Sequence, residues 1–287
     1  MKAIFKNELR SYFTSMTGYV FVGFMLLFAG IYTLALCLRS GFPSFEYVLA
    51  NMSFVFFIIV PVITMKVLSE EKRQKTDQLL YSLPITTTDV VLGKYFALLT
   101  VLAVPLLIMA FYPLILSLYG NVYLLTAYGA LLGFFFMGAA FLAIGLFISS
   151  VTESQMIAAG LCFVVLLLNY FITQISGVVS SAAYVSFMIL MVLAAAMAGI
   201  VWLMTRNWFS TLLVGGILLI GVALTYYWKP SLFEGLVGKA ITGISLFNRF
   251  YVFVSGSFNL TEIVFFVSVS VLFIFLSVQS LEKRRWS

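Results

Sequence analysis

The chain contains no histidine, only two cysteines and very few charged residues, which make up 9% of its 287 positions. Without histidine there is no HExxH metalloprotease motif, no serine–histidine triad and no imidazole proton relay. Cys37 and Cys162 lie in separate apolar runs and form no metal-binding spacing. No GxxxxGK[ST] phosphate-binding loop occurs, so the chain cannot hydrolyse ATP by that route. We therefore expect neither an enzyme nor a cofactor bound by this chain.

Hydrophobic residues, in contrast, make up 63% of the sequence, and its mean hydropathy is +1.14. A soluble protein of this length could not bury so much apolar surface, so the composition indicates an integral membrane protein. The apolar runs are about 20 residues long, which suits helices crossing a bilayer rather than the alternating strands of a β-barrel. The net charge of +6 does not indicate nucleic-acid binding, because no basic run is interleaved with aromatic residues.

The hydropathy pattern predicts an all-α polytopic membrane protein with about eight spans. The predicted spans are 18–38, 51–68, 95–118, 124–148, 155–175, 182–204, 209–228 and 261–281. Placing both termini in the cytosol puts 12 of the 16 Lys and Arg residues inside. The positive-inside rule favours this orientation. No acidic residue falls near the centre of a span, which argues against an aspartyl membrane protease and most proton-coupled transporters.

Two further segments have amphipathic character. Residues 1–17 place Ile4, Phe5 and Leu9 on one helical face and cations mostly on the other, which predicts a helix lying along the membrane surface; a frayed polar leader is the alternative. Residues 229–260 hold apolar stretches broken by polar residues, and we expect external, interface-lying or re-entrant short helices there. An ordered surface loop is the alternative.

The most distinctive segment is the polar loop 69–94 between the second and third predicted spans. Nine of the 26 charged residues lie between Lys66 and Lys94, and these two lysines are expected to reach toward lipid headgroups. Thr76 can cap a short helix, and the run beginning at Thr86 offers caps for the third span. The short helix carries an apolar face and a Pro stop, formed by Leu79, Leu80, Leu83 and Pro84. Such a face must bury against a partner or against the protein's own bundle.

The loop reads EE-x4-T-x2-LL-x3-P-x8-GK, with its members at Glu70, Glu71, Thr76, Leu79, Leu80, Pro84, Gly93 and Lys94. This pattern resembles the intracellular loop of type-2 ABC exporter permeases. The N-terminal KNELRSYFTS is similar to that family's interfacial elbow helix. The segment ISSVTESQ, at 148–155, resembles its second cytosolic contact. Within that family the chain most resembles the branch that contains gliding-motility and nitrous-oxide-reductase-maturation permeases.

The resemblance implies a single permease domain over 1–287, with a six-span core, an inserted span pair at 182–228 and a location in a bacterial cytoplasmic membrane. It implies partnership with a separate cytosolic ATPase, which holds the ATP and Mg²⁺, and with a second permease copy or paralogue. The residues expected to couple to the ATPase are Glu70, Glu71, Thr76, Leu79, Leu80, Leu83, Pro84, Thr152 and Glu153.

Small and polar residues within the spans suggest helix contacts or a pathway. Gly129 and Gly133 form a small-x3-small pattern, which suits either a dimer seam or internal packing. Asn169, Thr173 and Gln174 could line a translocation path or hydrogen-bond to neighbouring helices. Two other functions stay open: a self-sufficient secondary transporter or channel, and a membrane scaffold for an ATPase that transports nothing.

Overall fold

The computed structural model describes residues 1–39, 41, 43–75, 86–178, 183–192, 216, 221 and 224–286, and these residues form helices joined by turns. The chain divides into two compact units. The larger unit comprises Met1–Leu168 with Leu246–Ser287, and the smaller comprises Asn169–Ser245.

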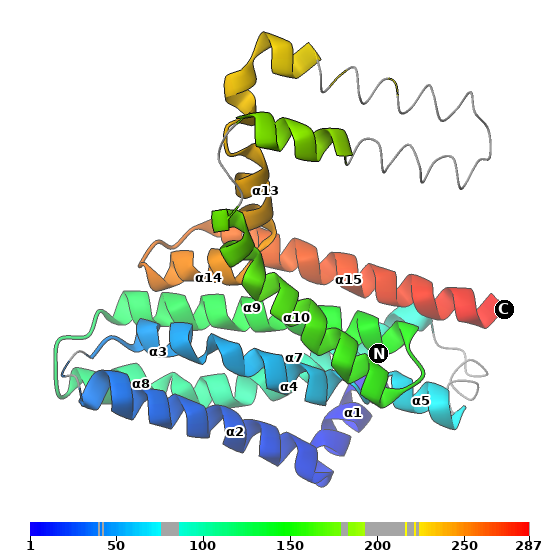
Figure 1. Cartoon of the computed structure of the whole chain (residues 1–287). Coiled ribbons are helices and arrows are strands. Elements are labelled where there is room, and N and C mark those ends of the chain that lie inside the picture. The colour runs from blue at the N-terminus through cyan, green and yellow to red at the C-terminus, as the bar shows by residue number, and fades with distance from the viewer. Residues whose placement is uncertain are drawn as a thin grey trace. The chain divides into compact units, whose positions relative to one another are not determined.

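Most helices of the larger unit run along one common direction (Figure 1). Helix α1 leaves the start of α2 at an angle, and α10 crosses the others obliquely. In chain order they are α1 (Lys2–Thr14), α2 (Met16–Tyr32) with the π-helical turn η1 (Thr33–Leu38), α3 (Phe45–Met52), the 3-10 turn η2 (Ser53–Val55), α4 (Phe56–Thr64), α5 (Ser69–Gln74), α7 (Thr87–Met109), α8 (Phe111–Ser117), α9 (Leu124–Val151), the first part of α10 (Gln155–Val178), α14 (Leu246–Val254) and α15 (Leu260–Trp286).

Six stretches of the described chain are long and apolar enough to cross a membrane. They are Met16–Leu38, Phe45–Gln74, Thr87–Ser117, Leu124–Val151, Gln155–Ile172 and Leu260–Arg284. Each overlaps one of the spans predicted from hydropathy. The predicted pair 182–204 and 209–228 lies largely outside the described residues, apart from the apolar helix Ala183–Val192 and short pieces near 216–228. The number of spans and their orientation therefore stay predictions.

The starts of two predicted spans differ from the starts of the helices. The second span begins at Phe45 rather than 51, because the first turns of α3 bury Phe45, Val48 and Leu49 in the bundle. The third begins at Thr87 rather than 95, because Thr86 caps the helix by accepting a hydrogen bond from the Asp89 amide at 3.2 Å. That cap confirms the expectation that the threonine run starts the third helix.

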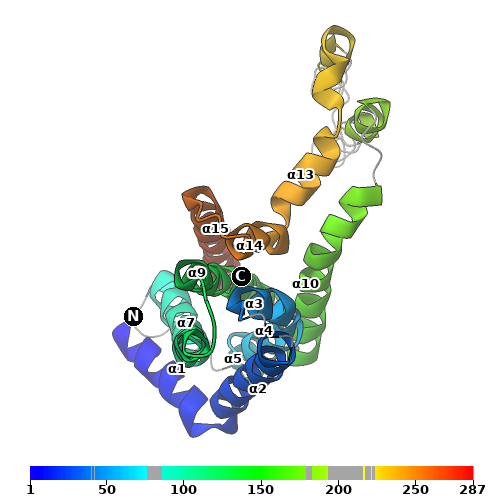
Figure 2. The same ribbon diagram turned by 90° about the vertical axis from the view of Figure 1, so that its left-hand side faces the viewer.

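Helix α9 lies at the centre of the larger unit and packs against α15, α14, α7, α4 and α3 (Figure 2). It is the most buried of the six stretches, 78% against 17–67% for the others. Its small residues make room for large neighbours: a Cβ at Gly133 would lie 2.7 Å from the Phe253 ring, and one at Gly138 would lie 2.8 Å from Leu102. Close approach through small residues is how membrane helices gain packing energy.

Phenylalanine rings fill the space beside α9. Phe56 and Phe134 have ring centroids 4.6 Å apart, and Phe141 and Phe247 are separated by 5.1 Å. Phe250 of α14 meets Phe134 at 5.7 Å. The short helix α14 is thus part of the core of the larger unit, although its sequence lies in the segment expected to be external.

Helix α14 is also held to the last long helix by charge. Arg249 donates to Glu262 at 2.5 Å, and its guanidinium lies 3.7 Å from the centroid of the Phe265 ring. Cation–π contacts of this kind add to the ion pair.

The smaller unit contains Ala183–Val192, η3 (Pro230–Phe233) and α13 (Leu236–Ile244). There Phe187 stacks on Tyr226 at 4.4 Å.

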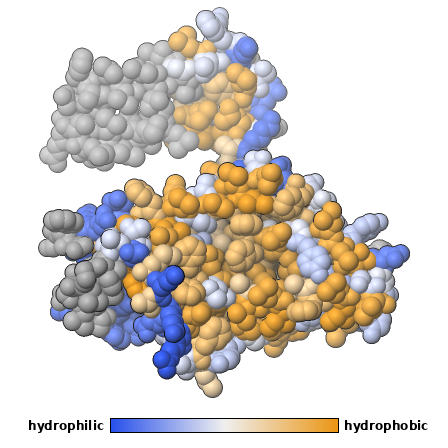
Figure 3. Space-filling view, turned by 180° about the vertical axis from the view of Figure 1, so that it is seen from behind, coloured by the Kyte–Doolittle hydropathy of each residue, from blue (hydrophilic) through white to orange (hydrophobic). Residues whose placement is uncertain are grey.

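The surface of the larger unit separates by polarity. Hydrophobic residues cover the middle of its face, and hydrophilic residues gather at its ends (Figure 3). Helix α1 follows the same rule, because its predicted apolar residues are half-buried whereas Lys2, Lys6 and Arg10 are exposed.

We expect Gly145→Ala to destabilise the bundle, because a Cβ there would lie 2.8 Å from Thr64 Cγ2 and 2.9 Å from Thr64 Cβ. Overpacking of this kind costs roughly 1–3 kcal/mol. Gly160→Ala is the matched control, since no atom lies within 4 Å of its added Cβ. Thermal unfolding of the purified proteins in detergent should show a lower midpoint only for Gly145→Ala. Equal midpoints would contradict the close approach of α9 to α4.

Candidate functional site

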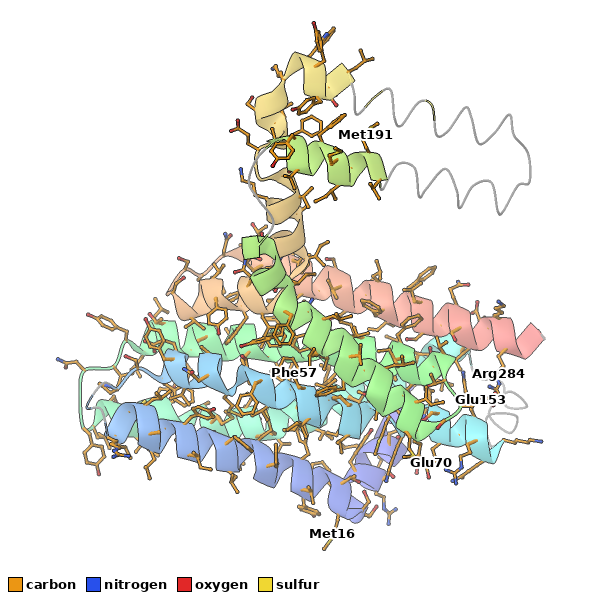
Figure 4. All side chains as sticks on the ribbon, viewed as in Figure 1. Met16, Phe57, Glu70, Glu153, Met191 and Arg284 are labelled. Carbon is orange, nitrogen blue, oxygen red and sulfur yellow. The ribbon has the colours of Figure 1, made fainter. Side chains whose placement is uncertain are left out.

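The loop predicted to couple to an ATPase is described at both ends but not in its middle. Thr76, Leu79, Leu80, Leu83 and Pro84 all lie outside the described residues. The first flank is α5, which ends at Lys75 in the left-handed conformation with φ 57°. The second flank is the start of α7. Both flanks lie at the end of the bundle that carries Glu70, Glu153 and Arg284 (Figure 4).

Lys94 is the centre of this end of the bundle. Its side chain is 2% exposed and belongs to α7. The ammonium donates to Glu8 of α1 at 2.5 Å, to Glu71 of α5 at 2.7 Å and to the carbonyl oxygen of Val67 at 3.0 Å. One buried cation therefore joins three separate helices. The expectation that Lys94 reaches toward headgroups is wrong, because its three donors are used inside the protein.

The neighbouring Gly93 explains how α1 comes so close. A Cβ at Gly93 would lie 3.1 Å from Ile4 Cγ2 and 3.3 Å from the Met1 carbonyl oxygen. Gly18 likewise allows a close approach at the α1–α2 joint, where a Cβ would lie 2.6 Å from the Tyr12 carbonyl oxygen. In the Gly-Lys pair of the loop pattern, Gly93 thus allows α1 to approach α7 closely, and Lys94 binds α1 through Glu8.

The last turn of α9 caps the first flank. The Ser149 hydroxyl accepts hydrogen bonds from the backbone amides of Leu68 and Ser69, each at 3.1 Å. These amides begin α5 and would otherwise lack intrahelical partners. Because Ser149 is fully buried, the start of the polar loop is fixed to the central helix of the bundle.

A second lysine strengthens this connection. Lys72 is 5% exposed, and its ammonium donates to the Ser150 carbonyl oxygen. The same carbonyl oxygen accepts a hydrogen bond from the Ser280 hydroxyl of α15 at 3.0 Å. A cation at the carboxyl end of a helix is favoured by the helix dipole. The end of α9 therefore binds α5 and α15 at one point.

The predicted second contact lies beside this point. Thr152 donates back to the Ile148 carbonyl oxygen at 2.9 Å and ends α9. Glu153 is 69% exposed and pairs with Arg284 of α15 at 2.7 Å. On the other side, Thr87 donates to Glu282 at 2.9 Å. Both predicted contact segments are thereby joined to the last turns of α15.

The remaining predicted residues lie elsewhere. Gly133 packs inside the larger unit, whereas Gly129 lines an apolar pocket of about 410 Å³ together with Leu125, Leu132 and Phe258. In the smaller unit, Asn169 donates to the Ile244 carbonyl oxygen at 3.4 Å, and its own carbonyl oxygen accepts from Ser245 at 3.4 Å. Thr173 and Gln174 belong to α10, but their side chains lie outside the described part.

The sequence predicted the polar loop but not all the residues that anchor its flanks. Glu8, Lys72 and Ser280 were not predicted to take part. The only signal for Glu8 was a single acid on an otherwise basic amphipathic helix, and Ser280 had none. Within the described ranges, no group of three or more Cys, Asp or Glu side chains is arranged to hold a metal ion.

Removal of the central charge should be costly. Lys94→Met leaves Glu8 and Glu71 facing each other without a cation, and breaking a buried ion pair costs about 3–5 kcal/mol. We expect a large fall in the thermal unfolding midpoint of the purified protein.

The triple variant Lys94→Met/Glu8→Gln/Glu71→Gln provides the control, because it removes all three charges together. It should recover much of the loss seen in the single variant. If the triple variant is no more stable than Lys94→Met, the three charges do not act as one unit.

Comparison with known proteins supports one family. Residues 2–235 match the family described as ABC-2 family transporter protein. Neither the curated proteins nor the solved structures contain a significant match. The family match covers most of the chain, including the polar loop and its partners on α1, α7 and α9. The chain is therefore a multi-pass membrane protein that belongs to the ABC-2 transporter family.

Proposed function

We propose that the chain is the membrane-spanning permease subunit of an ATP-driven ABC exporter. A separate cytosolic subunit binds ATP and Mg²⁺ and hydrolyses the nucleotide, and this chain converts the resulting movement into substrate translocation. Membership of the ABC-2 family supports the permease assignment. The absence of a phosphate-binding loop from the sequence supports hydrolysis on another polypeptide.

The observation that carries this proposal is the anchoring of the polar loop at both flanks. Segment 76–85 follows α5, which is fixed to α9 through Ser149. It precedes α7, which is fixed to α1 and α5 through Lys94. A force applied to the loop therefore reaches three helices of the bundle through short polar contacts. Anchoring of both flanks suits a segment on which an ATPase exerts force.

In this mechanism the ATPase docks on the helix around Leu79 and Leu80, with Glu70 and Glu71 at its base. Thr152 and Glu153 form the second contact. Closure of two ATPase copies on ATP tilts the bundles of two permease subunits, identical or paralogous, that face each other across the pathway. Asn169, Thr173 and Gln174 contribute polar groups to that pathway or to its helix contacts.

The proposed topology places both termini in the cytosol of a bacterial cell, with the chain in the cytoplasmic membrane. Variants with one added cysteine can test it with little background, because Cys37 and Cys162 are only 4% and 1% exposed. A membrane-impermeant maleimide should label Tyr123→Cys on intact cells. Arg73→Cys and Lys283→Cys should react only after the membrane is opened. Labelling of Lys283→Cys from outside would contradict an even number of spans.

The ATPase contact has a direct test. Leu79→Asp/Leu80→Asp places two charges on the apolar face that is expected to dock, so the tagged chain should insert normally but lose its partner. Affinity purification from the native membrane, with mass spectrometry of the co-purified proteins, measures this loss.

Tyr119→Asp/Tyr123→Asp is the control, because these tyrosines are 82% and 81% exposed in the turn between the third and fourth spans, near the opposite end of the bundle. It should retain a stoichiometric ATP-binding subunit, as the unchanged chain should. Recovery of the unchanged chain without any ATP-binding protein, or of the Leu79/Leu80 variant with it, would refute the coupling assignment.

A further inference from the structure

A polar pocket of about 390 Å³ lies beside the α1–α2 joint at the end of the bundle that carries Lys94. Its walls come from α1, the first turn of α2, the turn between α4 and α5, α5 itself and α7. We propose that this pocket binds the headgroup of a membrane lipid that carries both a primary ammonium and a phosphate, as phosphatidylethanolamine does. The pocket shares Glu70 and Glu71 with the base of the proposed ATPase contact, but the lipid proposal does not depend on that contact.

The pocket offers one charge of each sign for such a headgroup. Lys94 is already surrounded by Glu8 and Glu71, as described above. Lys66 is exposed and has no hydrogen-bond or ion-pair partner in the described part of the chain. Glu70 is half-buried, and one of its oxygens accepts only a neutral hydrogen bond, from Gln74 at 3.2 Å. Lys66 therefore suits a phosphate, and Glu70 suits an ammonium.

Neutral donors line the same wall. Ser11 and Tyr12 both line the pocket, and neither hydroxyl has a hydrogen-bond partner among the described residues. Burial, with a smaller contribution from the charge of Glu8, raises the pKa of Tyr12, so its phenol stays protonated and can donate a hydrogen bond. Phosphate oxygens are strong acceptors for such donors.

The total charge of the lining disfavours a simple anion. Three carboxylates, on Glu8, Glu70 and Glu71, face two ammonium groups, on Lys66 and Lys94. A lipid with a net negative charge would be repelled by a lining with a net negative charge. In a zwitterionic headgroup, the phosphate can pair with Lys66 and the ammonium with Glu70. This favours the ammonium-bearing headgroup over an anionic one.

The surroundings favour a lipid over a dissolved molecule. Ser15 and Thr17 line the pocket where the apolar part of α2 begins. On the first turns of that helix Met16 is 83% exposed, Tyr19 63% and Val20 62%. Met16 lies at the α1–α2 joint (Figure 4). A tyrosine beside the start of an apolar helix is typical of the membrane–water boundary. A headgroup in the pocket would therefore have an exposed apolar helix face beside it for its acyl chains.

The test uses the purified full-length chain in detergent and measures lipid binding by native mass spectrometry and by the shift in thermal unfolding midpoint. The probes are phosphatidylethanolamine, its N-methylated derivatives up to phosphatidylcholine, phosphatidylglycerol and soluble glycerophosphoethanolamine. Phosphatidylethanolamine should bind best. Phosphatidylcholine should bind about tenfold more weakly, since its trimethylated ammonium cannot donate hydrogen bonds.

Glu70→Gln and Lys66→Ala should each weaken phosphatidylethanolamine binding by about tenfold while leaving the lipid-free unfolding midpoint unchanged. Glu234→Gln and Lys6→Ala remove the same charges outside the pocket and should bind as the unchanged chain does. Equal binding of phosphatidylcholine, preferential binding of phosphatidylglycerol, or wild-type affinity in both pocket variants would overturn the proposal. Binding of glycerophosphoethanolamine as tight as that of the lipid would overturn the lipid as its occupant.

Discussion

The arrangement of this protein's polar end depends on one buried ammonium group. Lys94 follows the capped start of a long apolar helix, where an unpaired charge would be strongly unfavourable. Its neutralisation requires Glu8 from α1 and Glu71 from α5 to meet at one point, although they are 63 positions apart in the sequence. Satisfying this single charge therefore fixes the angle of α1, the position of α5 and the entry of α7.

The central helix α9 extends this constraint into the bundle. Its glycines let Phe253, Leu102 and Thr64 approach, so that the helix is buried along most of its length. Its last turn then accepts the amides of α5 at Ser149 and the ammonium of Lys72 at Ser150. The first flank of the polar loop is thus bound to the most buried of the six membrane-length stretches, where movement is opposed by close packing.

The sequence predicted those features that depend on local composition. Six apolar stretches and the Thr86 cap follow from residues within one helix, because transfer free energy and capping are local properties. The role of Lys94 was predicted wrongly, since its partner Glu8 lies 86 positions away and leaves no periodic signal. The start of the second span was missed for a similar reason: α3 is buried by contacts with α9, α2 and α14, which hydropathy within 45–52 does not reveal.

The ion cluster around Lys94 and the proposed lipid pocket share Glu8, Glu71 and Lys94 as lining residues. A headgroup held at Lys66 and Glu70 would therefore touch the same three helices that anchor the polar loop. Any movement of α1 or α5 that follows a push on the loop must change the shape of this pocket. A lipid that binds one shape of the pocket more tightly must also favour the corresponding position of the loop. By linkage, the free energy by which it favours that position equals the difference in its binding free energy between the two shapes. The joint between α1 and α2 is then the place where the composition of the surrounding membrane can influence the response of the loop.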